Sequence, residues 1–160
     1  MAKMSRSLAI AAATVAAVIV LAWIPGSTTA DNAGKASTAK AVAWPADQIQ
    51  FKPVIPGVTK AVLWGDPDKG AYGTLTRFAA GTKNALHTHS HDIKIVVISG
   101  TFVLGTETGE KQLGPGSYAL EPAGMKHTSG AAPGADCLFF EESDGKFDMK
   151  MLEGGASAAK

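Results

Sequence analysis

The four histidines of this 160-residue chain fall into two short stretches of the sequence. His87, His89 and His91 alternate in the run His-Thr-His-Ser-His, and His127 ends the run Pro-Ala-Gly-Met-Lys-His. Neutral imidazole is the commonest transition-metal ligand among protein side chains. Because alternate residues of an extended strand point to the same side, two or three of these imidazoles could share one centre. The sequence therefore predicts a buried metal site that His127 completes from a second segment.

Glycines and a proline at fixed distances frame both stretches. The first block precedes an apolar run that ends at Gly100, and it reads Gly81-x5-His87-x-His89. The second block follows after 15 intervening residues and reads Gly116-x5-Pro122-x-Gly124-x2-His127. Glycine permits the backbone turns that strand corners need. We expect the Pro-x-Gly bend to return His127 toward the first pair of histidines.

These blocks resemble the paired motifs of the cupin superfamily, Gly-x5-His-x-His-x3-4-Glu-x6-Gly and Gly-x5-Pro-x-Gly-x2-His-x3-Asn. The match covers residues 81–131, with Ala131 in place of the family's asparagine. Residues 96–101 and 136–148 are similar to a branch of single-domain cupins of undefined function, related to the anti-sigma-type sensor cupins. The resemblance implies an all-β fold, a cupin-type jelly roll or double-stranded β-helix barrel.

Carried over residue by residue, the resemblance makes His87, His89 and His127 metal ligands. The family's glutamate ligand falls at position 93 or 94, where this chain has Ile93 and Lys94. Isoleucine has no donor atom, and a protonated lysine repels a cation. The implied centre therefore has three histidines and open positions, which suits a divalent transition metal, one of Fe, Zn, Ni, Mn or Cu.

Several residues are candidates to replace the missing carboxylate. His91 shares the strand parity of His87 and His89 and is the candidate fourth ligand. Asp92 is the nearest carboxylate in the sequence, but it has the opposite parity. Four glutamates are also candidates that no spacing distinguishes: Glu107, Glu121, Glu141 and Glu142. The alternatives to a metal centre are a solvated histidine face or a barrel that has lost its metal.

The elements that must position the histidines are short strands. From Trp44 onward, glycine, proline or Asp-Gly interrupts the sequence every 8–12 residues or so, and no long window shows a helical apolar repeat. Many short strands at regular spacing are typical of an all-β sandwich or barrel. The β-rich runs are Ile49–Val54, Thr59–Trp64, Tyr72–Phe78, Ile93–Ser99, Thr101–Leu104, Ser117–Leu120, Asp136–Glu141 and Phe147–Met151. A short turn is expected near residues 45–48.

Residues 1–30 have the order of a secretory signal peptide. Lys3 and Arg6 precede an apolar run over 8–24, and small residues follow it. We expect cleavage after Ala30 and a periplasmic or secreted protein; an uncleaved membrane anchor is the alternative. A flexible linker over 31–42, a cupin domain over 43–152 and a flexible tail over 153–160 complete the predicted organisation.

Charge and cysteine content limit the classes of partner. Without residues 1–30, the chain keeps 13 of its 15 basic residues against 14 acidic ones, so its net charge is about −1. No basic run remains, which disfavours nucleic acid and anionic membranes as partners. Cys137 is the single cysteine, so an internal disulfide is excluded, and its apolar neighbours indicate a buried, inert thiol rather than a redox or ligand thiol.

Two classes of function fit the predicted centre. The first is a metal-dependent enzyme acting on a small molecule, such as an oxygenase, hydrolase or isomerase, with His91, Asp92 and Glu121 as acid–base candidates. The second is a non-catalytic sensing or binding module for a metal or small molecule. Tyr72 and Tyr118 are candidates to orient a substrate, and the expected pocket lining comes from Phe102, Leu104, Phe139 and Phe140. A homodimer that pairs through an edge strand over residues 49–54 is a further expectation.

Overall fold

The computed structural model describes residues 40–153 of the chain. The predicted signal peptide, most of the linker (31–39) and the end of the tail (154–160) lie outside the described residues. Within residues 40–153, no helix has the length and apolar character needed to cross a bilayer.

Eleven strands and one short 3₁₀ helix make up the described part of the chain. The helix η1 (Ala46–Gln48) lies where a turn was expected. The strands are β1 (Lys52–Ile55), β2 (Val58–Gly65), β3 (Tyr72–Phe78), β4 (Lys83–Thr88), β5 (Ile93–Ser99), β6 (Phe102–Thr106), β7 (Gly109–Leu113), β8 (Tyr118–Glu121), β9 (His127–Ala131), β10 (Cys137–Ser143) and β11 (Lys150–Met151).

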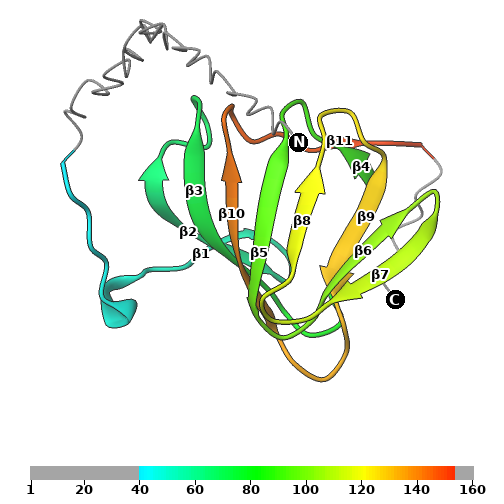
Figure 1. The fold of residues 1–160 in the computed structure, drawn as a ribbon, viewed down its shortest axis with the longest axis horizontal. Helices are drawn as coiled ribbons and strands as arrows, with labels where there is room; N and C mark the ends of the chain where they lie inside the picture. Colours follow the sequence, from blue (N-terminus) through cyan, green and yellow to red (C-terminus); the bar gives the residue numbers. More distant parts are fainter. Residues whose placement is uncertain (1–39, 154–160) are drawn as a thin grey trace, which may run out of the picture. The chain divides into compact units, whose positions relative to one another are not determined.

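The strands form two antiparallel sheets that enclose one interior. The six-stranded sheet has the order β1-β2-β3-β10-β5-β8, and the five-stranded sheet has the order β11-β4-β9-β6-β7 (Figure 1). The chain crosses repeatedly between the sheets after β3, so residues distant in the sequence meet in the interior. This arrangement confirms the all-β, cupin-type jelly roll.

The core at the closed end of the interior is aromatic. Phe78, Phe102 and Phe139 contact one another with ring centroids 4.9–5.9 Å apart. Cys137 is fully buried beside them, as expected of an inert thiol, and burial raises its pKa to about 11. Leu104 also faces inward, whereas Phe140 alternates to the opposite face of β10 and is half-buried.

Three strands were not among the predicted β-rich runs, namely β4, β7 and β9. Strand β7 is exposed along most of its length and reads Gly-Glu-Lys-Gln-Leu. Strands β4 and β9 carry polar residues into the interior, including His87 and Ser129. None of the three shows the alternation of apolar and polar residues that marks a half-buried strand.

A bend after β8 joins the two histidine blocks. Gly124 has φ of 76°, in the left-handed region that favours glycine, and its N–H donates to the carbonyl of His89 at 2.9 Å. The N–H of Ala123 donates to the carboxylate of Asp92 at 2.8 Å. These contacts bring the segment before His127 against the segment after His89, as the Pro-x-Gly spacing predicted.

Candidate metal centre

Three histidine rings meet in the interior between the two sheets. His87 on β4 pairs directly with His127 on β9, and His89 follows β4. The ring centroids lie 4.2 Å apart for His87–His127, 4.9 Å for His87–His89 and 5.2 Å for His89–His127. One donor atom from each ring lies within 4.8 Å of the other two, and all three side chains are buried. This spacing allows one metal ion to contact all three rings.

Backbone carbonyls hold all three rings in one tautomer. Nδ1 of His87 donates to the carbonyl of Ala85 at 2.7 Å, and Nδ1 of His127 donates to that of Met125 at 3.0 Å. Nδ1 of His89 contacts the carbonyl of Asp148. Because a carbonyl only accepts, each Nδ1 carries the proton of the neutral ring, and Nε2 of the neutral ring then has a lone pair free for a metal.

Glu121 supplies a buried carboxylate to the same centre. Its Oε2 lies 3.3 Å from Nε2 of His127 and 3.8 Å from Nε2 of His89. Glu121 is the direct partner of Ile93 in the pairing of β8 with β5. The cupin pattern places its carboxylate at position 93 or 94; here a carboxylate comes instead from Glu121 on the neighbouring strand, opposite Ile93. Spacing along the chain could not select Glu121 among the candidate glutamates, because its position beside the histidines depends on the register between β8 and β5.

The buried polar atoms of the centre fit a cation. Oε1 of Glu121 and Nε2 of His127 are buried and make no hydrogen bond within the described residues. An unpartnered buried carboxylate oxygen is costly, since it has lost its water without gaining a donor. A divalent cation would satisfy both atoms, so the donor set of three imidazoles and one carboxylate fits a transition metal.

Burial and neighbouring charges shift the pKa values of His87 and His127 in opposite directions. Burial, with a smaller effect of the neighbouring His127 and His89, lowers the pKa of His87 to about 4, so His87 is neutral near pH 7. Burial alone would also lower the pKa of His127, but the Glu121 carboxylate raises it above the ordinary value of 6.5. Without metal, a proton on His127 is therefore stabilised by Glu121.

We expect Glu121→Gln to weaken metal binding. The amide keeps the shape of the side chain but removes the charge beside His89 and His127, so affinity should fall about 10–100-fold, as for other groups that support metal ligands. Titration calorimetry with Zn²⁺ measures the change. Glu142→Gln is the matched control, since Glu142 pairs with Lys94 on the outside of the same sheet. Equal affinities for wild type and Glu121→Gln would remove Glu121 from the centre.

Metal affinity should also depend on pH through His127. A metal must displace the proton that Glu121 stabilises, so affinity falls about tenfold per pH unit below the pKa of His127. Because that pKa is raised, the decline begins above pH 6.5. In Glu121→Gln the pKa falls, and the decline moves to lower pH. Zn²⁺ titrations over a pH series test this, and identical profiles for the two proteins would contradict it.

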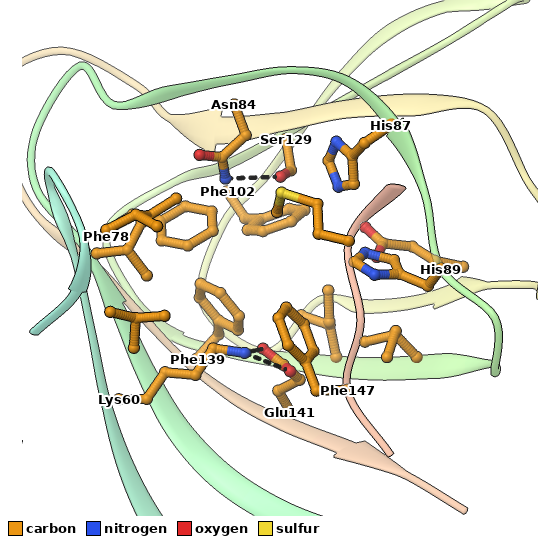
Figure 2. A pocket seen from close by; sticks show the side chains of 17 residues that line it. Lys60, Phe78, Asn84, His87, His89, Phe102, Ser129, Phe139, Glu141 and Phe147 are labelled. Atoms are coloured by element: carbon orange, nitrogen blue, oxygen red, sulfur yellow. Dashed lines mark hydrogen bonds and ion pairs between the residues drawn. The ribbon is translucent and has the colours of Figure 1, made fainter. Parts of the chain in front are cut away.

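A cavity of about 120 Å³ adjoins the histidines, lined by His87, His89 and Glu121 and by apolar side chains. Figure 2 shows the histidines on one side and the pair Lys60–Glu141 across the cavity. Nζ of Lys60 lies 2.8 and 3.1 Å from the two carboxylate oxygens of Glu141, and 3.7 Å from the centre of the Phe147 ring.

Glu141 is fully engaged in this pair. It also accepts hydrogen bonds from the hydroxyl of Tyr72 at 2.7 Å and from Thr76 at 3.1 Å. Burial would raise the pKa of Glu141, but Lys60 and the two hydroxyls hold it below its ordinary value. The sequence indicated Tyr72 only as a substrate-orienting candidate and gave no signal for Lys60. The cavity thus has a second charged pair opposite the histidines.

The other sequence candidates lie outside the histidine cluster. The ring of His91 packs on Gly145, so that a Cβ there would clash with it. Asp92 accepts from the backbone of Ala123, and Glu142 pairs with Lys94. Tyr118 points to the outside of the sheet, and Glu107 is exposed. Of the residues considered as replacements for the missing carboxylate, only Glu121 lies within 4 Å of a ligand nitrogen in the described chain.

Comparison with known proteins agrees with the geometry. The model of a family described as a ChrR cupin-like domain matches residues 39–145. A search of curated proteins found no match. Three solved structures illustrate the shared fold.

The polyketide cyclase RemF from Streptomyces resistomycificus aligns with a TM-score of 0.62 at 18% identity, over 72% of this chain and 89% of that one. KdgF from Halomonas sp. gives 0.54 at 23% identity, over 62% and 92%. The complex of SigE with the anti-sigma ChrR from Rhodobacter sphaeroides gives 0.51 at 22% identity, over 62% and 51%. At these low identities, the TM-scores show a common fold. Since the family model covers more than half of the sequence, the chain belongs to the ChrR cupin-like family.

Proposed function

We propose that this protein is an exported metal-dependent enzyme, an oxygenase that acts on a small molecule at a three-histidine centre. The observation that carries the proposal is the convergence of three buried histidine rings, each with its Nδ1 on a backbone carbonyl, beside a cavity. Export is inferred from the order of charge, apolar run and small residues over 1–30.

The cavity limits the size of the substrate. Benzene occupies an apolar cavity of about 150 Å³, so a volume of about 120 Å³ suits a molecule of roughly six non-hydrogen atoms. The lining is largely apolar and includes Ile93, Ile95 and Phe147. A much larger substrate would need Phe147 or the edge residues Val54 and Ile55 to move.

Charge favours an anionic substrate. Three neutral imidazoles and the Glu121 carboxylate leave a divalent ion with one net positive charge, which a monoanion neutralises. A redox-active metal in this position would supply electrons for dioxygen chemistry and would polarise a ligand oxygen. The chain contributes the histidines, the largely apolar cavity and the Lys60–Glu141 pair opposite them.

The test is metal content followed by oxygen consumption. The untagged protein is purified from an exporting host, its metals are measured, and oxygen uptake is followed with a panel of small carboxylates and dicarbonyl compounds after loading with Fe²⁺. We expect about one equivalent of metal and uptake with at least one compound. Tight metal binding without turnover of any compound would support the sensing module instead. Failure to retain metal under any loading condition would contradict both functions.

A further inference from the structure

A polar pair with unused hydrogen-bond donors lines the cavity beside the histidines. Asn84 on β4 and Ser129 on β9 are cross-strand partners, and Nδ2 of Asn84 donates to Oγ of Ser129 at 3.0 Å. Figure 2 shows both side chains at the wall of the cavity that also carries His87. The second amide N–H of Asn84 and the hydroxyl proton of Ser129 make no further hydrogen bond within the described residues. Two such donors can bind one oxygen atom of a ligand.

An irregularity in β4 places Asn84 in the same inward row as His87. On a regular strand, residues three apart point to opposite faces. Here Asn84 lies opposite Ser129 and His87 lies opposite His127, so β4 has one residue more than β9 between the two pairs. Such β-bulges change the direction of side chains and are frequent beside active sites. His127 and Ser129 are two residues apart and both are buried, so the polar pair continues the row of histidines into the cavity.

The charged pair across the cavity, Lys60 and Glu141, has little capacity left for a ligand. Both carboxylate oxygens of Glu141 bind Lys60, and each also accepts a hydrogen bond from a neighbouring hydroxyl group. The centre of the Phe147 ring lies 3.7 Å from Nζ of Lys60, so the ring covers the ammonium group. Apart from these residues and the metal centre, the rest of the lining within residues 40–153 is apolar. A second polar group of a ligand therefore finds its free partners at Asn84 and Ser129.

We propose that Asn84 and Ser129 determine substrate specificity by donating hydrogen bonds to a neutral oxygen of the substrate, a hydroxyl or a carbonyl. This inference rests on the proposed function, in which a small monoanion lies at the histidines. The substrate class is then the short hydroxy- or oxocarboxylates. A second carboxylate in place of the neutral oxygen would add a negative charge that the net charge of the centre does not neutralise.

The spacing of the row limits the separation of the two groups in the substrate. Residues two apart on a strand, such as His127 and Ser129, are separated by roughly 7 Å along it. A hydrogen bond spans about 3 Å of this distance. The remainder matches the separation between the carboxylate and the 3-hydroxyl oxygen of a short acid. A cavity of about 120 Å³ has room for such a molecule.

A pair of acids of equal shape tests the inference on the exported full chain loaded with Zn²⁺. Titration calorimetry compares each enantiomer of 3-hydroxybutanoate with 3-methylbutanoate, which has a methyl group in place of the hydroxyl. We expect the wild type to bind one hydroxy acid about tenfold more tightly, because the methyl group leaves the donors of Asn84 and Ser129 unpaired. Ser129→Ala and Asn84→Leu should each reduce this preference to about threefold or less. Both variants should keep the wild-type affinity for Zn²⁺.

Ser143→Ala is the matched control, because Ser143 is equally buried but does not line the cavity, so this variant should keep the preference. Equal binding of the acids by the Zn²⁺-loaded wild type, or binding of none of them, overturns the inference and leaves the metal centre standing. A preference that persists in both Ser129→Ala and Asn84→Leu, or that is also lost in Ser143→Ala, overturns it as well. Loss in one of the two cavity variants alone supports the inference and assigns the donor to that residue. A wild type that retains no Zn²⁺ overturns both the inference and the proposed function.

Discussion

His127→Ala is expected to lower metal affinity by more than about 100-fold, because loss of a ligand exceeds the 10–100-fold effect of losing a group that only supports one. His87→Ala should behave alike, since the two side chains face each other across β4 and β9. Metal analysis of the purified proteins and Zn²⁺ titration calorimetry measure the effect. The wild type should hold close to one equivalent and the variants almost none.

His91→Ala is the matched control for this experiment. His91 belongs to the same His-x-His-x-His run, but its ring packs on Gly145 rather than in the cluster. It should therefore keep wild-type metal content. Loss of metal in His91→Ala, or retention in both His87→Ala and His127→Ala, would show that the ligands lie elsewhere.

Lys60→Met should destabilise the fold by about 3–5 kcal/mol, the usual effect of removing one partner from a buried ion pair. Both side chains are nearly buried, and Met fills the volume of the Lys60 stem but leaves the Glu141 carboxylate without its cation. Urea unfolding of the metal-free protein measures the difference. Lys69→Met is the control, because the Lys69–Asp66 pair lies on the surface, where such pairs contribute only ~0–1 kcal/mol.

The difference in the free energy of unfolding between wild type and Lys60→Met should become smaller as pH falls. In the wild type the pKa of Glu141 is below its ordinary 4.5, so its contribution is present above that pH and is lost as pH falls through the folded-state pKa. In the variant, burial raises the pKa, and protonation relieves the unpaired charge. The double change Lys60→Met with Glu141→Gln should recover much of the stability at neutral pH. If Lys60→Met loses the same free energy of unfolding at every pH, lost packing and not charge is responsible.

The sequence was sufficient for the fold and for the three converging histidines. The spacing of glycine, proline and histidine in two blocks reflects turns that only certain residues adopt. These turns can therefore be predicted from the sequence without knowing which strands become neighbours. Gly124 illustrates this: the pattern predicts a bend at this glycine, and the structure shows its left-handed φ and a hydrogen bond from its N–H to the carbonyl of His89.

Glu121 and Lys60 could not be selected from the sequence. Their roles depend on how the strands are arranged. Glu121 joins the histidines through the register of β8 with β5, and Lys60 on β2 reaches Glu141 on β10 across the intervening strand β3. The composition of β8 also hides its inward side, because its apolar residues Tyr118 and Leu120 face outward. A rule that assigns apolar residues to the core gives the wrong face here.

The contact between His89 and Asp148 affects when the metal site can form. Asp148 lies in the connection from β10 to β11, near the end of the chain, and its side chain accepts from both the N–H and the hydroxyl of Ser90. The ring of His89 therefore lacks this support until the connection from β10 to β11 has packed against the segment after β4. A complete metal centre therefore requires the closed barrel, so the metals present where the chain finishes folding determine what it binds.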